Sequence, residues 1–193
     1  NGLVETSPQN LESDRRSVID NPPAILTEEE YRAEINALIS ELDIPEGVPA
    51  FTYAACVWIF NHIRKGDGLG IFAHPYWIQR NTAFQVPEKL LDHMMKTQPF
   101  DAFEVLGGER YFQHNGFQTI RYYEDRARGY DYPIVGSTDS HCSLAQNVKH
   151  MIGSTFVFAP QNERASLIQS IKEKYSIAID TISEEYRLVG DLR

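Results

Sequence analysis

Pro133-Ile-Val-Gly-Ser-Thr-Asp-Ser-His141 predicts a short buried strand, ended by Gly136, and a polar loop after it. Asp139 and His141 come just beyond this strand, and the carboxyl ends of strands are where open α/β sheets and barrels place their chemistry. If the backbone stays extended, both side chains project from one surface. The pair then suits metal binding, or a general base oriented by its neighbour. The alternative is an aspartate that caps the next helix, beside a surface histidine.

A second stretch, Gly68-Leu-Gly-Ile-Phe-Ala-His-Pro-Tyr-Trp77, has the same order of glycines, apolar strand and terminal histidine. Pro75 ends the strand by removing a ladder donor and keeps His74 out of the helical region. We therefore expect His74 to be extended at the strand exit. A third apolar run, Ala102–Leu106, carries one carboxylate, Glu104, and ends at two glycines.

These three stretches, in this order, resemble the PHP (polymerase and histidinol phosphatase) domain family, from about Thr27 to near Tyr186. The resemblance implies a distorted seven-stranded β/α barrel, up to three divalent metals and, in many members, hydrolysis of phosphate esters. It implies metal-ligand roles for His74, Asp139 and His141, with the last two also catalytic. Glu104 lies where relatives often carry a glutamate near the site, which suggests a substrate-binding role, but the asparagine expected shortly after it is replaced by glycine.

The chain also departs from that family, whose members begin with a His-x-His strand. No histidine precedes His62, and no His-x-His occurs anywhere in the chain. We therefore expect residues 1–26 to form an extended arm or linker, and residues 27–193 to form the C-terminal portion of a PHP-like α/β barrel with mostly parallel strands. Such an incomplete barrel is expected to bind metal weakly or not at all, and to show no phosphatase activity unless the upstream segment is restored.

Composition narrows the classes of partner. The 193 residues carry a net charge of −9, which disfavours binding to a nucleic-acid backbone but not to a small phosphorylated substrate, because metals can supply the positive field. Zinc, manganese and iron all suit mixed histidine and carboxylate ligands. Two cysteines do not make a disulfide scaffold. No apolar run reaches membrane-spanning length, and the cytoplasm is the favoured compartment. A homo-oligomer is left open.

The remaining pattern alternates helices and apolar strands, which is typical of an α/β fold. Thr27 and Glu30 form a capping box that opens the first helix, and Pro87 suits the first position of another. A long helix is predicted over Arg110–Arg128. Its expected core residues are Phe117, Ile120 and Tyr123. Further predictions are a strand over Ser154–Ala159, a helix capped by Asn162, and a last strand over Ser176–Asp180.

The other histidines and one arginine complete the candidate residues. His62 is expected at a helix end, and His93 and His114 at the surface. Arg80 could bind a phosphate bidentately beside aromatic walls, although a packed loop with a solvent-facing arginine is the favoured interpretation. Three functions stay open at this point: a PHP-type phosphoesterase, a non-catalytic PHP-like module, and a metal hydrolase of the amidohydrolase kind.

Overall fold

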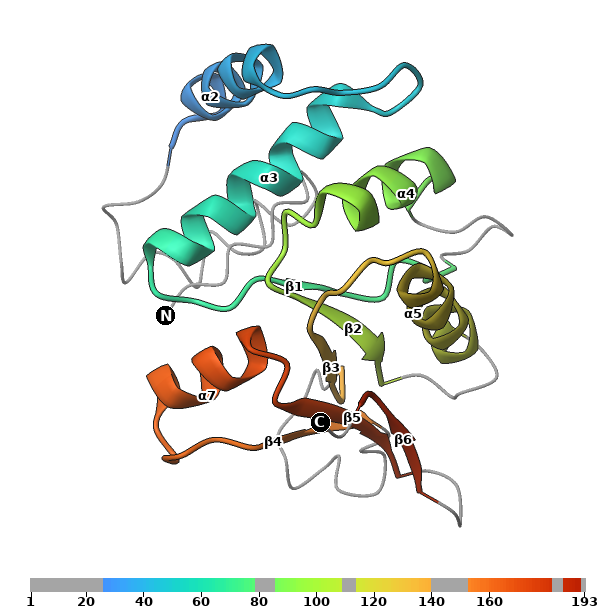
Figure 1. Ribbon diagram of the computed structural model, residues 1–193. Coiled ribbons are helices and arrows are strands. Elements are labelled where there is room, and N and C mark those ends of the chain that lie inside the picture. The colour runs from blue at the N-terminus through green and yellow to red at the C-terminus, as the bar shows by residue number, and fades with distance from the viewer. Residues whose placement is uncertain (1–25, 79–85, 109–113, 140–152, 182–185, 192–193) are drawn as a thin grey trace.

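Two three-stranded sheets lie next to each other in the computed structural model (Figure 1). The structure describes residues 26–78, 86–108, 114–139, 153–181 and 186–191. The expected α/β class is confirmed, but these ranges contain no closed barrel. Five helices are described: α2 (Glu28–Glu41), α3 (Ala50–Lys65), α4 (Glu88–Thr97), α5 (Gly116–Ala127) and α7 (Arg164–Lys172). The six strands are β1 (Ile71–Phe72), β2 (Ala102–Leu106), β3 (Ile134–Gly136), β4 (Gly153–Val157), β5 (Ser176–Asp180) and β6 (Arg187–Val189).

The first sheet is parallel, as predicted, and the second is not. Strands β1, β2 and β3 pair in parallel in that order, whereas β4, β5 and β6 pair antiparallel. The expectation of mostly parallel strands is therefore wrong for half of the strands. An apolar run in the sequence does not indicate whether the strand paired with it runs parallel or antiparallel. The burial pattern of β4, in which only the first of five residues is buried, fits a sheet with one exposed face, as antiparallel sheets commonly have.

The two sheets are joined at the end of β3. The Gly136 N–H donates to Thr155 Oγ1 at 2.9 Å, and the same hydroxyl donates to the Gly136 carbonyl at 2.6 Å. A Cβ at Gly136 would clash with the carbonyl oxygen of Ser154 on β4. The glycine that the sequence marks as a strand end is therefore also the point at which the sheets approach backbone to backbone.

The capping box at the first helix is confirmed. Thr27 Oγ1 accepts from the Glu30 N–H at 3.2 Å, and Glu30 Oε2 accepts from the Thr27 N–H at 2.8 Å. Elsewhere the caps differ from prediction. The helix α4 begins one residue after Pro87, and α7 begins after Glu163 without a side-chain cap, so the cap predicted at Asn162 is wrong.

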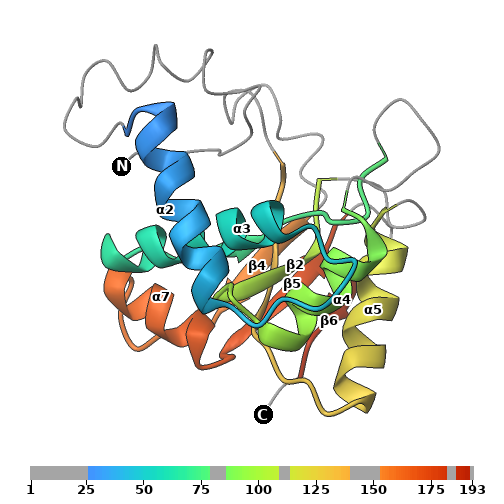
Figure 2. The same ribbon diagram turned by 90° about the horizontal axis from the view of Figure 1, so that it is seen from above.

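Helices α3 and α4 lie on one side of the parallel sheet, α5 lies beside it, and α2 crosses over α3 (Figures 1 and 2). The core between these layers is apolar and aromatic. Phe103 and Val105 of β2 are fully buried in it, together with Met94 and Met95 of α4. No helix in the described ranges combines the length and apolarity needed to cross a bilayer.

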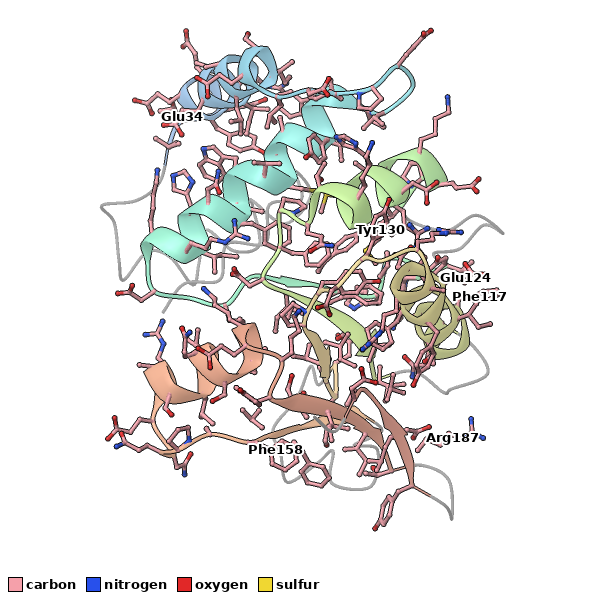
Figure 3. The ribbon with its side chains drawn as sticks, viewed as in Figure 1. Glu34, Phe117, Glu124, Tyr130, Phe158 and Arg187 are labelled. Atoms are coloured by element: carbon pink, nitrogen blue, oxygen red, sulfur yellow. The ribbon has the colours of Figure 1, made fainter. Side chains whose placement is uncertain are left out.

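Helix α5 buries the face opposite to the predicted one. The expected core residues Phe117, Ile120 and Tyr123 are 47%, 58% and 48% exposed. Figure 3 shows Phe117 on the side of α5 away from the sheets. The buried face instead carries Arg121 and Asp125, which form an ion pair at 2.8 Å. A paired arginine and aspartate can be buried together, and an apolar-stripe argument does not detect such a pair.

His93 on α4 is buried rather than exposed as predicted. Only 7% of the residue is exposed, its ring packs against Tyr53 at a centroid distance of 4.4 Å, and its Nε2 has no hydrogen-bond partner among the described residues. Burial lowers the pKa of His93, and nearby Lys96 lowers it further. Asp43 raises the pKa of His93, but this effect is smaller.

This burial predicts an acid-sensitive contribution to stability. Because the folded pKa lies below the unfolded value of about 6.5, the unfolded chain binds the proton more readily, and stability falls as pH falls below that value. Between about pH 7.5 and pH 5.5, we expect the melting temperature of His93→Gln to fall by less than that of the wild type. Thermal unfolding followed by circular dichroism measures this. His62→Gln, at an exposed helix end, serves as the control, and an equal effect in both variants would contradict the assignment.

Candidate metal centre

The parallel strands bring the candidate residues to one edge of the first sheet. Strand β1 pairs with β2 through Phe72 and Phe103, and β2 pairs with β3 through Glu104 and Val135. Because all three strands run in the same direction, the segments that follow β1 and β3 leave at the same edge. Those segments carry His74 and Asp139, two of the residues predicted as metal ligands.

His74 opens a tight turn instead of being extended. Its φ is 28°, and its carbonyl accepts from the Trp77 N–H at 3.0 Å, with Pro75 in the second position of the turn. Proline suits that position because its φ is preset. A positive φ is uncommon for a residue other than glycine and persists where surrounding contacts hold it. The turn therefore fixes where the imidazole leaves strand β1.

Glu104 is the residue that holds this turn. Its carboxylate is 3% exposed, and Oε2 accepts from the His74 N–H at 2.9 Å while lying 3.0 Å from His74 Nδ1. Oε1 accepts from the Ser137 hydroxyl, which follows strand β3. One buried carboxylate on the central strand therefore ties together the exits of all three strands. These donors also satisfy a charge that would be costly to bury alone.

The contact with Glu104 assigns the two nitrogens of the His74 ring. A carboxylate accepts, so Nδ1 carries a proton, and in the neutral ring Nε2 is then the nitrogen that can coordinate a metal. Histidines that bind metals almost always have this arrangement, in which a carboxylate or carbonyl fixes the ring through the nitrogen that does not coordinate. The sequence located both residues but did not predict their pairing, because they lie 30 positions apart, Glu104 on β2 and His74 just after the neighbouring β1.

Asp139 also has a positive φ, 47°, so the extended backbone that was expected to align it with His141 is absent at this residue. Aspartate tolerates this left-handed region better than most residues. The loop after β2 lies directly against it: a Cβ on Gly108 would clash with the Thr138 carbonyl and come within 2.8 Å of Asp139 Cβ. The glycine found where the family resemblance predicts an asparagine therefore permits the close approach of these two loops.

A buried asparagine supports the same loop and was not singled out from the sequence. Asn115 is fully buried, its Oδ1 accepts from the Gly107 N–H at 2.7 Å, and its amide donates to the Gly107 carbonyl at 3.2 Å. It lies at the start of α5 yet makes no side-chain cap to that helix. Its position alone suggests an ordinary cap, so the contact with Gly107 is visible only in the fold.

Aromatic rings line the turn after His74. Trp77 lies between two imidazoles, with ring centroids 5.9 Å from His74 and 5.1 Å from His114. His114, predicted at the surface, is half-buried, and its Nδ1 is buried without a hydrogen-bond partner in the described ranges. Tyr76 stacks on Phe117 of α5 at 5.8 Å. Burial raises the pKa of the Tyr76 hydroxyl, although its hydrogen bond with Arg121 opposes this rise.

The donor chemistry at this edge fits a divalent metal in part. An oriented imidazole and a carboxylate are suitable ligands. No group of three histidine, cysteine or carboxylate side chains with metal-binding geometry occurs in the part of the chain that the structure describes. The predicted ligand His141 and the predicted phosphate-binding Arg80 lie outside the described residues. The roles of all these residues therefore stay predictions.

Comparisons with known proteins show a partial similarity to a solved structure. No protein-family model matches the chain, and no curated protein matches it. Among solved structures, the chain is similar to a two-domain protein from Bacteroides vulgatus that contains a predicted PHP-like metal-dependent phosphoesterase. The TM-score is 0.45 at 16% sequence identity, and the match covers 62% of this chain and 34% of the other. The chain thus spans about a third of the length of that protein.

Proposed function

We propose that the protein containing this chain is a metal-dependent phosphoester hydrolase of PHP type. The observation that carries the proposal is the contact of His74 Nδ1 with the buried Glu104 carboxylate at 3.0 Å. A buried carboxylate that fixes an imidazole at the carboxyl ends of parallel strands is the arrangement of an oriented metal ligand. The family resemblance in the motifs around His74 and Asp139 points in the same direction.

In this proposal His74, Asp139 and His141 hold the divalent ion. The bound ion supplies positive charge beside the phosphoryl group and lowers the pKa of a water at the site. Glu104 acts by positioning His74, which refines the substrate-binding role predicted for it. Arg80 binds the phosphate bidentately. The proposal also gives Asp139 and His141 the catalytic role of accepting a proton from the attacking water.

The experiment uses the full-length gene product that contains these 193 residues. It is assayed with manganese or zinc on p-nitrophenyl phosphate, on its diester and on an anilide. We expect ester hydrolysis, no amide hydrolysis, and a loss of about 100-fold or more for Asp139→Ala. The melting temperature of this variant should fall only slightly, because Asp139 belongs to the site rather than to the core and the remaining cost is that of alanine at a φ of 47°. Glu124→Gln, an exposed carboxylate on α5, is the control and should keep full activity.

Three results would count against the proposal. Hydrolysis of the anilide alone would favour the amidohydrolase interpretation. A folded protein without turnover on any of these substrates, with either metal, would favour a non-catalytic module. Failure of Asp139→Ala to fold would show that Asp139 has a structural role as a cap.

A further inference from the structure

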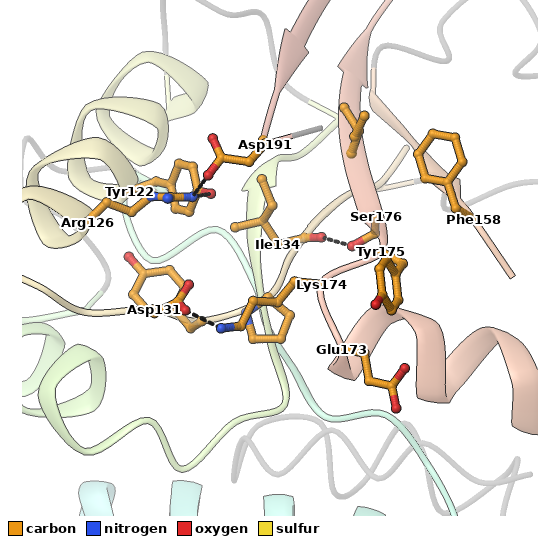
Figure 4. A pocket seen from close by; sticks show the side chains of 14 residues that line it. Tyr122, Arg126, Asp131, Ile134, Phe158, Glu173, Lys174, Tyr175, Ser176 and Asp191 are labelled. Carbon is orange, nitrogen blue, oxygen red and sulfur yellow. Dashed lines mark hydrogen bonds and ion pairs between the residues drawn. The ribbon is translucent and has the colours of Figure 1, made fainter. Parts of the chain in front are cut away.

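A cavity of about 410 Å³ lies at the other end of the parallel sheet from His74 (Figure 4). Its floor includes Pro133 and Ile134, where β3 begins, while Asp139 follows the end of the same strand. Ser176 of β5 closes the floor by donating its hydroxyl to the Ile134 carbonyl at 2.9 Å. The volume falls within the range of small-molecule sites, and the candidate metal centre does not account for it.

Two ion pairs stand on the walls of this cavity. Arg126 pairs with Asp191 at 2.5 Å and also donates to the Tyr122 hydroxyl at 3.0 Å. Lys174 pairs with Asp131 across the cavity, as the dashed line in Figure 4 shows. All four charged side chains are partly exposed, between 27% and 46%. Each positive group is therefore already matched by a carboxylate.

Lys174 occupies a costly backbone conformation. Its φ is 68°, at the end of α7, where a glycine would be the usual residue. The turn is closed by bonds from the Lys174 and Tyr175 N–H groups to the Ile171 and Ser170 carbonyls, 2.9 and 2.8 Å long. A glycine would make this turn with less strain but would remove the ion pair of Lys174 with Asp131. The strained residue at this turn is thus also the one that supplies a positive charge to the cavity wall.

Two exposed aromatic rings form the remaining wall. Phe158 is 56% exposed and Tyr175 is 50% exposed, and the Phe158 N–H donates to the Tyr175 carbonyl at 2.8 Å. Both residues also line a second cavity of about 440 Å³, with Pro160 and Ser170. The two cavities share Glu173 as well, so they adjoin at these three residues, and we refer to both together as the groove.

We propose that this groove binds a neutral, polyhydroxylated ligand of the size of a disaccharide. An anion would have to compete with Asp131 and Asp191 for the two cations, beside Glu173 and in a chain of net charge −9. A cation would have to displace Lys174 and Arg126. Hydroxyl groups both donate and accept, so they can bond to both members of each ion pair without breaking it. The apolar faces of sugar rings can then pack on Phe158 and Tyr175.

The experiment titrates the 193-residue chain with maltose, cellobiose and chitobiose, followed by saturation-transfer NMR and calorimetry. Inorganic phosphate and tetramethylammonium are the anionic and cationic probes. We expect at least one disaccharide to bind saturably at millimolar concentration and neither ion to compete with it. Phe158→Ala should weaken the binding by about tenfold or more. Phe156→Ala is the matched control because Phe156, on β4 and two residues before Phe158, is 53% exposed but lines neither cavity.

The proposal does not depend on the metal centre, so either one can be disproved without affecting the other. It is overturned if none of the disaccharides saturates, if phosphate or tetramethylammonium binds in the groove instead, or if the two phenylalanine variants lose affinity equally. Both side chains are more than half exposed, so neither truncation removes core packing. Unchanged thermal unfolding of both variants confirms that affinity alone is being compared.

Discussion

Asp125→Ala is expected to lower the free energy of unfolding by about 3–5 kcal/mol, the cost of leaving a buried charge without its partner. Asp125 is fully buried and accepts from Arg121 at 2.8 Å and from the Tyr132 hydroxyl at 3.1 Å. Arg121 is itself only 8% exposed; burial lowers its pKa, but its hydrogen bonds with Asp125 and Asp92 raise the pKa above the usual value. Without Asp125, a buried guanidinium would keep its contact with Asp92 at the surface and its hydrogen bond with the neutral Tyr76 hydroxyl, but would lose its buried carboxylate partner.

Urea unfolding followed by circular dichroism measures this loss, and Asp92→Ala is the matched control. Asp92 contacts the same guanidinium at 2.5 Å, but its side chain is 54% exposed, so its removal should cost at most about 1 kcal/mol. Equal losses in the two variants would show that burial does not decide the strength of this cluster. A small loss in both would show that α5 is not anchored through Arg121.

Glu104→Gln is expected to weaken manganese binding by about 10–100-fold, the usual effect of losing a partner that orients a metal ligand. The amide keeps the size of the side chain and can still accept from His74, but it no longer carries the charge that favours the Nδ1–H form of the ring. Asp101→Asn is the matched control because Asp101 is also a largely buried carboxylate, just before the start of β2. It bonds to Arg64 and the Gly70 N–H. The affinity of the Asp101→Asn variant for manganese should match that of the wild type.

The features that the sequence predicted well are local. The capping box joins Thr27 and Glu30, three positions apart, and the buried stripe of α4 ends at Met94 and Met95 as its spacing predicts. Helix α5 shows the limit of this reasoning. Its apolar residues are as regularly spaced, yet it buries Arg121 with Asp125. This face is buried because Asp92 of α4 and Tyr132 bond to the pair, and these partners lie outside α5.

In the candidate site, too, the local features could be predicted from the sequence and the long-range contacts could not. The strand exits at His74 and Asp139 could be found from glycine, proline and apolar runs, because each signal lies within a few residues. The turn at His74 and its contact with Glu104 depend on the pairing of β1 with β2, which no local pattern specifies. Asn115 was missed for the same reason, since its partner Gly107 lies across a loop.

Paramagnetic broadening by manganese tests most directly the claim that the edge beyond β1, β2 and β3 forms a metal centre. In a titration of the 193-residue chain followed by amide NMR, we predict that signals of His74, Glu104 and Asp139 broaden first, even where affinity is weak. In Glu104→Gln they should broaden only at higher manganese concentration. Broadening that spreads over the acidic surface, or centres on the glutamates at the start of α2, would contradict the account.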